Sequence, residues 1–258
     1  MTSVTISIVS YCQKNLLERC LTHISDIMTL QRGWQTVVVD NNSSDDSADM
    51  VAKDYPWVKL IPLKKNLGFA GGHNKAYSET NSPIFIVLNP DVIALPGSLE
   101  TLVRVFDLFP QAAIVGPCLL NSDGSPQFSA RRFYTWRTVV CRRFTFPGSD
   151  KLIAHHLMRE SDLNHLQCVD WILGAAMGIR RSAFDGNGLF DTRYRLYFED
   201  VDLCYFAHKR GWDVLYCPQS KMIHDHQRAS AKTFFSPAVV NHCISWIRFY
   251  VKTIEAFR

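Results

Sequence analysis

The first half of the chain alternates apolar runs with segments of helical periodicity. Apolar β-formers without polar alternation predict buried strands at residues 4–10, 36–39, 58–62 and 84–88. Apolar residues recur at helical spacing over 16–30 and 70–79, and another helix is expected to start at Ser44, with acidic residues in its first turn. Strands joined by such helices imply right-handed crossovers, so this half predicts a Rossmann-like parallel sheet.

The second half departs from this alternation. Helices are predicted at residues 99–109, 198–209 and 238–257, and strands at 112–115, 175–179 and 212–217. Between about residue 121 and residue 165 the chain is polar, aromatic and basic, with turn signals at Asp123-Gly124 and Pro147-Gly148. We therefore expect an α/β domain over residues 1–232, with halves 1–117 and 118–232, and an amphipathic C-terminal helix over 233–258.

Composition narrows the class of protein. The chain has 258 residues, 47% of them hydrophobic and 20% charged, which suits one large globular domain. The net charge of +4 is too small to indicate nucleic acid, so no nucleic-acid partner is expected. No apolar run approaches the roughly 18 residues that a bilayer-spanning helix needs.

The cysteines argue against a zinc protein. None of the eight forms a C-x-x-C pair, and several fall inside predicted strands or helices, where a free thiol packs like a small apolar group. The start of the chain has no signal peptide and goes directly into a strand. We therefore expect a cytoplasmic protein, dissolved or resting on the inner face of the cell membrane.

The strongest candidate for chemistry is Asn89-Pro90-Asp91, which closes the predicted strand 84–88. Pro90 cannot continue a central strand, so Asp91 is expected just beyond the carboxyl edge of the sheet, where open α/β sheets bind ligands. A carboxylate there can hold a divalent cation against a phosphorylated ligand. The plain alternative is a turn that caps a helix starting near Gly97.

Two other segments follow predicted strands at the same edge. Asp40 is placed where a carboxylate commonly accepts hydrogen bonds from a nucleoside, although an Asx turn with capping by Ser44 or Asp45 is the alternative. Residues 66–74 place several glycines at a helix start, which suits the approach of phosphates to backbone N–H groups. Close packing of the helix on the sheet is the alternative there.

Acidic and imidazole side chains in the second half complete the candidates. Asp200 and Asp202 lie roughly 200° apart on a helix, so we expect Asp200 to face a cleft as a general base and Asp202 to serve structure. An acidic helix cap is the alternative. His224 follows the last predicted strand and can ligate a metal that Asp91 begins to bind, unless it is an exposed turn histidine.

In their order along the chain, these segments resemble family 2 glycosyltransferases of the GT-A fold. The resemblance rests on residues 6–11, 39–45, 66–74, 88–91, 171–176 and 198–204, and on His224. The finer pattern is similar to bacterial rhamnosyltransferases and the related galactofuranosyltransferases of surface-polysaccharide assembly. It makes 1–117 the nucleotide-binding half and 118–232 the acceptor-side half.

The resemblance implies a role for particular residues. Asp200 matches the catalytic base, and Asp91 and His224 match ligands of Mg²⁺ or Mn²⁺. The expected contacts to the nucleotide-sugar are Ser10, Asp40, Asn66, Gly68, Gly71, Asn74, Asn89 and Trp171. Asn89 departs from the family's D-x-D motif, because an amide oxygen replaces the first carboxylate and removes one negative charge.

The implied reaction is inverting, metal-dependent transfer of a sugar from a nucleotide-sugar. The preferred expectation is L-rhamnose from dTDP-L-rhamnose, moved to a polyprenyl-diphosphate-linked glycan in O-antigen, capsule or cell-wall polysaccharide synthesis. Four arginines interleaved with aromatics are expected to meet the acceptor phosphates at the inner-membrane surface. They are Arg131, Arg132, Arg142 and Arg143.

Two other functions are compatible with parts of the sequence. A nucleotidyltransferase also pairs a parallel sheet with a metal-binding aspartate, but the segment after the first strand, residues 10–14, has no glycine for the expected phosphate loop. A non-catalytic nucleotide- or glycan-binding module would explain Asn89 as a sign of a decayed site.

Overall fold

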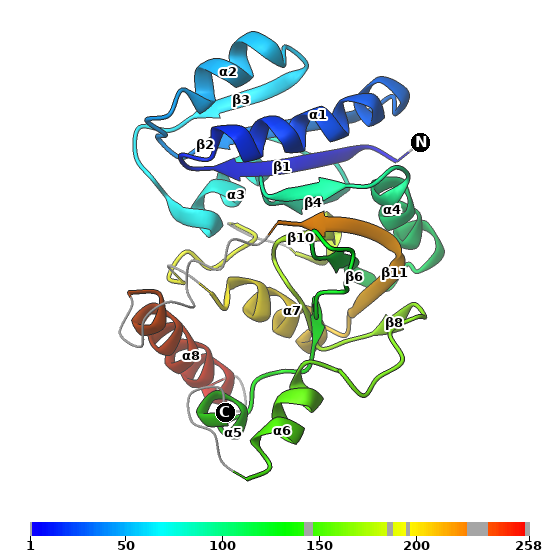
Figure 1. The fold of residues 1–258 in the computed structure, drawn as a ribbon, viewed down its shortest axis with the longest axis vertical. Coiled ribbons are helices and arrows are strands. Elements are labelled where there is room, and N and C mark those ends of the chain that lie inside the picture. Colours follow the sequence, from blue (N-terminus) through cyan, green and yellow to red (C-terminus); the bar gives the residue numbers. More distant parts are fainter. Residues whose placement is uncertain (1, 142–146, 185–187, 195–196, 226–236, 256–258) are drawn as a thin grey trace.

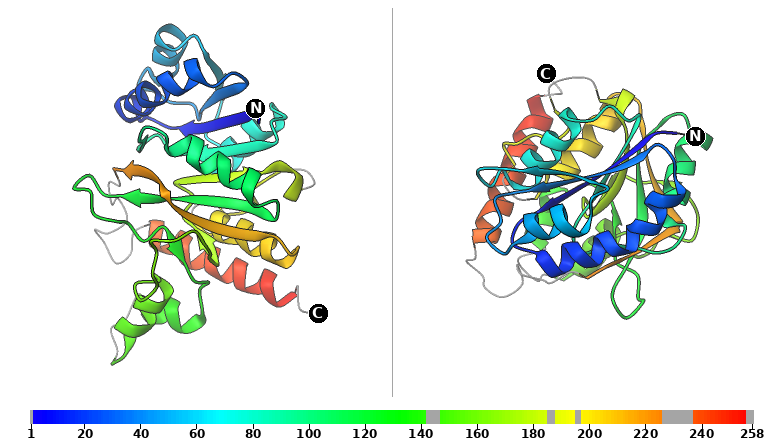
Figure 2. Two further views of the ribbon diagram at one scale, coloured as in Figure 1. Left: turned by 90° about the vertical axis from the view of Figure 1, so that its right-hand side faces the viewer. Right: turned by 90° about the horizontal axis from the view of Figure 1, so that it is seen from above.

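A central mixed sheet organises the molecule (Figures 1 and 2). The computed structural model describes residues 2–141, 147–184, 188–194, 197–225 and 237–255. Within them the strand order is β3-β2-β1-β4-β10-β6-β11-β5, with β8 (Gln167–Cys168) added beside β11. The α/β class with a mostly parallel sheet is therefore confirmed.

The first half follows the predicted alternation. Its strands are β1 (Val4–Ser10), β2 (Trp34–Asp40), β3 (Val58–Pro62) and β4 (Ile84–Leu88), all mutually parallel. Its helices are α1 (Lys14–Leu30), α2 (Ser47–Asp54) and α3 (Gly68–Ser78). The strands carry apolar side chains on both faces because helices cover both, which is why they read as continuous apolar runs.

The predicted start of α2 at Ser44 is wrong by three residues. Asp46 has a left-handed backbone, with φ of 58°, so no helix can run through it. The carboxylate of Asp45 accepts the backbone N–H of Ser47 at 3.3 Å and that of Lys14 at 2.9 Å. Asp45 therefore holds the first residues of two helices, α2 and α1.

In the second half the sheet becomes mixed, because some of its strands run antiparallel to the first four. An antiparallel strand, β10 (Ala176–Arg180), lies between β4 and β6 (Ala112–Leu120), and β11 (Asp213–His224) runs parallel to β6. β11 extends seven residues past the predicted end at 217, through a register shift between Cys217 and Lys221. The short strand β5 (Val92–Ala94) pairs antiparallel with the end of β11. This pairing was not predicted.

The segment expected to be irregular contains short helices. α5 (Trp136–Cys141) and α6 (Ser149–His156) lie below the sheet, and β7 (Ala130–Arg131) pairs with β9 (Trp171–Ile172) in a separate two-stranded ribbon (Figure 1). A 3₁₀ turn, η1 (Arg181–Ala183), follows β10.

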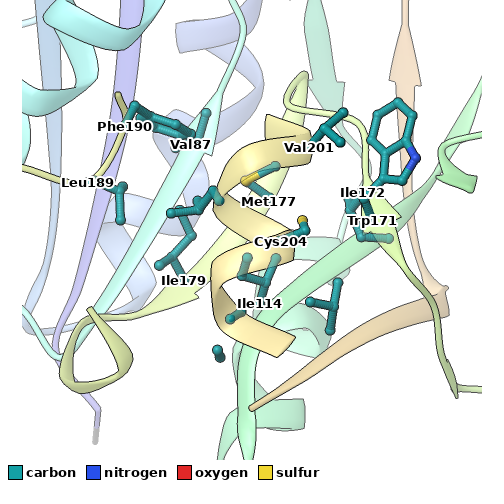
Figure 3. Packing of buried hydrophobic residues seen from close by; sticks show 14 of the residues in the cluster. Val87, Ile114, Trp171, Ile172, Met177, Ile179, Leu189, Phe190, Val201 and Cys204 are labelled. Atoms are coloured by element: carbon teal, nitrogen blue, oxygen red, sulfur yellow. The ribbon is translucent and has the colours of Figure 1, made fainter. Parts of the chain in front are cut away.

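Helices cover the two faces of the sheet unequally. α1, α2 and α4 (Ser98–Leu108) pack on one face. α3 and α7 (Glu199–Lys209) pack on the other, where Val201 and Cys204 of α7 belong to one apolar cluster with side chains of β10 and β6 (Figure 3). The C-terminal helix α8 (Pro237–Glu255) packs against α7, and its Phe249 side chain is buried. Among the helices that the structure describes, none is both long and apolar enough to cross a bilayer.

Candidate functional site

The carboxyl ends of β1 and β2 present two buried oxygens. Ser10 and Asp40 are register partners, and their exposed fractions are 0% and 3%. Oδ2 of Asp40 accepts the backbone N–H of Ser43 at 3.0 Å, three residues on, which is one residue further than in an Asx turn. Within the described part of the chain, Oδ1 of Asp40 and Oγ of Ser10 have no hydrogen-bond partner. Because buried polar atoms are normally paired, these two mark a place for polar groups of a ligand.

The glycine-rich start of α3 is built for packing and for a tight turn. Oδ1 of Asn66 accepts the N–H of Gly68 at 2.7 Å, and Gly68 has a positive φ of 72°. A Cβ atom on Gly72 would lie 2.7 Å from Cγ1 of Val9, so only glycine lets α3 approach β1 this closely. A Cβ atom on Gly71 would similarly meet Leu67 at 2.7 Å.

Asn74, an expected contact of the nucleotide-sugar, is hydrogen-bonded to the backbone of residues 189–190. Its Oδ1 accepts the N–H groups of Leu189 and Phe190 at 2.9 and 2.8 Å, and its Nδ2 donates to the carbonyl of Phe190 at 2.7 Å. These three bonds occupy both ends of the amide. The side chain therefore fixes residues 188–190 against α3.

The segment after β4 turns into a strand. The N–H of Asn89 donates to the carbonyl of Ala175 at 2.8 Å, and its carbonyl accepts the N–H of Val92 at 3.1 Å, where β5 begins. Pro90 and Asp91 therefore form a turn, as the plain alternative expects, but the turn leads into β5 and does not cap the helix that starts at Ser98. Asp91 lies between β4 and β5 at the same edge as Asp40.

Asp91 and His224 meet at this edge. Nε2 of His224 lies 3.5 Å from Oδ2 of Asp91, and the two side chains are only 4% and 16% exposed. Because His224 is buried as the last residue of β11, opposite Val92, it is not an exposed turn histidine. Oδ1 of Asp91 is also buried without a hydrogen-bond partner among the described residues.

This donor set fits a hard divalent cation. The carboxylate oxygen of Asp91 suits Mg²⁺ or Mn²⁺, the imidazole nitrogen of His224 adds a ligand typical of transition metals such as Mn²⁺, and the amide of Asn89 lies two residues before Asp91. In the described ranges no group of three His, Cys, Asp or Glu side chains gathers to hold a metal by itself. A cation here would therefore depend on oxygens of a phosphorylated ligand and water for the rest of its coordination shell.

Asp200 is joined to the same edge through the loop that leads into β10. Its Oδ2 accepts the N–H of Gly174 at 2.9 Å, and its Oδ1 accepts the N–H of Val201 at 2.9 Å. Gly174 precedes Ala175, whose carbonyl holds Asn89. A chain of backbone contacts thus runs from the Asn89 segment to the carboxylate of Asp200.

Burial makes Asp200 and its neighbour unusual acids. Burial raises the pKa of Asp200, and the N–H groups of Gly174 and Val201 and the positive charge of Arg131 oppose that rise. Burial and then the negative charge of Asp200 raise the pKa of Glu199 to about 8. A carboxylate with a raised pKa is a stronger base, so Asp200 has the electrostatics of a proton acceptor.

Asp202 points to the other side of α7, as the helical geometry predicts. Its carboxylate accepts hydrogen bonds from the hydroxyl of Tyr194 at 3.1 Å and from Nζ of Lys252 at 2.7 Å. Lys252 also pairs with Asp191 at 3.1 Å. Asp202 therefore attaches α8 to α7.

The predicted arginines are not a uniform outward patch. Arg131 lies with its guanidinium 5.0 Å from the centre of the Trp171 ring and exerts its charge on Asp200. Arg132 pairs with Asp170 at 3.3 Å. Arg142 and Arg143 lie outside the described residues.

Trp171 packs in the core. It is 2% exposed, its ring stacks on that of Tyr134, and its Nε1 donates to the carbonyl of Arg132 at 2.9 Å. The expected contact of Trp171 with a nucleotide-sugar stays a prediction.

Gly174 and Gln127 lie at the site, although their sequence context did not predict a role for either. Gly174 belongs to the 171–176 motif, but only its close approach to Asp200 shows that a larger residue would crowd the carboxylate. Gln127 contacts His224 and follows the Asp123-Gly124 turn by three residues, a spacing that by itself indicates nothing.

Comparison with known proteins shows the family to which this chain belongs. The model of the family described as glycosyltransferase like family 2 matches residues 2–248. The chain is 29% identical to the N-acetylglucosaminyl-diphospho-decaprenol L-rhamnosyltransferase of Mycobacterium tuberculosis, over 93% of this chain and 81% of that protein. It is 25% identical to the rhamnosyltransferase WbbL of Escherichia coli, over 96% of this chain and 93% of the relative.

Solved structures share the fold. The mannosyltransferase PcManGT from Pyrobaculum calidifontis, in complex with GDP-Man and Mn²⁺, superposes with a TM-score of 0.64 at 16% identity and covers 98% of this chain. Residues 1–349 of Staphylococcus aureus TarS superpose with a TM-score of 0.59 at 13% identity, over 87% of this chain. This chain spans 64% and 60% of the lengths of those two chains, respectively.

Proposed function

Because the chain belongs to the glycosyltransferase like family 2, with a GT-A fold, we propose that it transfers L-rhamnose from dTDP-L-rhamnose to a lipid-linked glycan. Relatives named as rhamnosyltransferases support the sugar, and the name of the mycobacterial one specifies an acceptor on diphospho-decaprenol. The observation that carries the proposal is the set of buried oxygens without partners at one sheet edge: Ser10 Oγ, Asp40 Oδ1 and Asp91 Oδ1.

The nucleoside end of the donor would bind at β1 and β2. Oδ1 of Asp40 would accept a hydrogen bond from the pyrimidine, and Oγ of Ser10 lies beside it in register. Asp91 and His224, with the amide of Asn89 nearby, would hold Mg²⁺ or Mn²⁺. Such a cation neutralises the charge that develops on a diphosphate leaving group.

Asp200 would act as the base. It accepts the proton of the acceptor hydroxyl while that oxygen forms a bond to the anomeric carbon, and the bond from that carbon to the diphosphate oxygen breaks. The nucleoside diphosphate leaves with the electron pair. A single displacement of this kind inverts the anomeric configuration.

The acceptor would approach from the side of α7 and α8. The positive charge of Arg131, close enough to act on Asp200, suits a phosphate of the acceptor. α8 exposes Ile244, Ile247 and Val251, at 48, 54 and 48% of their surface, on one face of the helix. We assign this face to the inner-membrane surface, where a polyprenyl-linked acceptor would be met.

A panel of nucleotide-sugars tests the function. The wild-type protein should turn over dTDP-L-rhamnose in the presence of a lipid-diphosphate acceptor with Mg²⁺ or Mn²⁺, and should lose turnover in EDTA. Asp91→Ala should behave like EDTA-treated wild type, whereas Asp54→Ala, which changes an exposed carboxylate of α2, should not.

Each component of the proposal has its own contradicting result. Full turnover in EDTA would remove the metal role. Equal or better turnover with a UDP-hexose would replace the donor while leaving glycosyl transfer intact. Binding of nucleotide-sugars with no turnover of any donor would favour a non-catalytic binding module.

A further inference from the structure

Gln127 contacts both the backbone and the ring of His224. Its Nε2 donates to the carbonyl oxygen of His224 at 2.8 Å, and its Oε1 lies 2.8 Å from Nδ1 of the imidazole. The turn after β6 brings Gln127 there. Gly124 closes the turn with φ of 81°, and the N–H of Gln127 returns to the carbonyl of Leu119 at 2.8 Å. His224, buried at the end of β11, is therefore held by two hydrogen bonds from the loop that follows β6.

The direction of these hydrogen bonds follows from groups that can only accept. The carbonyl oxygen of His224 accepts, so the nitrogen of the Gln127 amide must face it. The amide oxygen then faces Nδ1 of His224. Because an amide oxygen accepts only, Nδ1 must carry the proton.

A second set of contacts requires the same direction. Nε2 of Gln127 also donates to Oδ1 of Asn121 at 2.9 Å, and Nδ2 of Asn121 donates to Oγ of Ser125 at 2.8 Å. Oγ of Ser125 donates to Oδ1 of Asp123 at 2.5 Å. The carboxylate of Asp123 is the last acceptor in this series of hydrogen bonds. Exchanging the oxygen and nitrogen of the Gln127 amide would therefore break both this series and the hydrogen bond to the carbonyl of His224.

A proton on Nδ1 leaves the lone pair of neutral His224 on Nε2. That nitrogen lies 3.5 Å from Oδ2 of Asp91. A nitrogen lone pair and a carboxylate oxygen at this separation are complementary to a cation between or beside them. We propose that Gln127 is a positioning residue that fixes the tautomer and ring orientation of His224, so that Nε2 and Asp91 share one divalent cation. This inference rests on the proposed metal-dependent function.

Variants of Gln127 separate its two contacts. Gln127→Leu removes both and should weaken the affinity for Mn²⁺ alone, followed by the electron paramagnetic resonance of free Mn²⁺, by about 10-fold or more. Gln127→Glu keeps an acceptor for Nδ1–H but loses the donor to the carbonyl of His224, and should bind Mn²⁺ nearly as wild type does. The matched control is Gln167→Leu, because Nε2 of Gln167 also donates to two backbone carbonyls, those of Asp162 and His165, but meets no imidazole.

The outcomes distinguish this inference from the function on which it rests. If Gln127→Glu loses as much affinity as Gln127→Leu, or if Gln127→Leu binds Mn²⁺ like wild type while Asp91→Ala does not, the positioning role is overturned and the metal site stands. If wild-type protein and Asp91→Ala bind Mn²⁺ equally weakly, the metal site falls, and this inference with it.

The tautomer can also be read without any substitution. Nitrogen-15 spectra of the metal-free wild-type protein, at a pH where His224 is neutral, should show the Nδ1–H tautomer. A spectrum of the Nε2–H tautomer would overturn the inference even if every variant failed to fold.

Discussion

The backbone N–H of Gly174 donates to Oδ2 of Asp200 at 2.9 Å, and a side chain at position 174 would crowd this carboxylate. A Cβ atom at position 174 would lie 3.2 Å from Cβ of Asp200 and 3.3 Å from its Oδ2. The loop that enters β10 thus sets the position of the proposed base on α7.

Gly174→Ala should displace the Asp200 carboxylate and lower kcat by about 10-fold or more, because small misplacements of a reacting group are costly. Steady-state kinetics with donor and acceptor measure this. Gly178→Ala is the control, since its Cβ would crowd Phe106 within the core at 2.9 Å. That variant should lose stability with kcat retained. Equal kcat in wild type and Gly174→Ala would show that the close approach has no catalytic role.

Asp200→Asn should lower kcat by roughly 10²–10⁴, because an amide cannot accept the proton. The affinity for the donor, measured by calorimetry with the nucleoside diphosphate, should change far less. Asp202→Asn should lower the melting temperature while largely retaining kcat, because Asp202 accepts hydrogen bonds from Tyr194 and Lys252. A greater loss of kcat in Asp202→Asn than in Asp200→Asn would exchange the two roles.

Glu199 should make the protein less stable as the pH rises. Burial, and then the charge of Asp200, raise its pKa in the folded protein to about 8 from the usual 4.5, so the native state binds more protons than the unfolded state between those values. The free energy of unfolding should therefore fall from about pH 4.5 to about pH 8. Glu199→Gln should flatten this decline. Denaturant titrations across that range provide the measurement, and an unchanged slope in the variant would assign the decline to other groups.

The attachment of α8 should depend on Lys252. Lys252→Met leaves the buried Asp202 carboxylate without its cation and should cost about 3 kcal/mol, at the low end for buried pairs because Lys252 is partly exposed. Lys75→Met breaks the exposed pair with Glu79 and should change the free energy of unfolding much less. If the two variants lose equal stability, Lys252 does not anchor α8.

The exposed face of α8 should bind anionic membranes. In flotation with anionic liposomes at low salt, wild-type protein should rise with the vesicles, and the triple change of Ile244, Ile247 and Val251 to Ser should reduce this. Leu30→Ser is the control, because Leu30 is 73% exposed at the end of α1. Absence of wild-type binding, or equal binding by the triple variant, would leave α8 without a membrane role.

The class of fold and the positions of the first four strands along the chain could be predicted from sequence alone. Apolar β-formers in 84–88 and helical spacing in 16–30 are local patterns, and each strand end places its next polar residue at the carboxyl edge. Asp40 and Asp91 were located in this way. The opposite directions of Asp200 and Asp202 also followed from helix geometry alone.

Which distant residues meet at the carboxyl edge of the sheet depends on the tertiary structure. β5 is three residues long and is recognisable only by its pairing with β11, and that pairing carries His224 to Asp91. The amides of Asn74 and Gln127 find their partners about 100 residues away, so no local pattern distinguishes a ligand contact from a structural one. The periodicity of apolar residues depends only on neighbours along the chain, so it predicts which side chains are buried. The site is formed by strand ends that are far apart in the sequence, so local periodicity does not predict which of them meet.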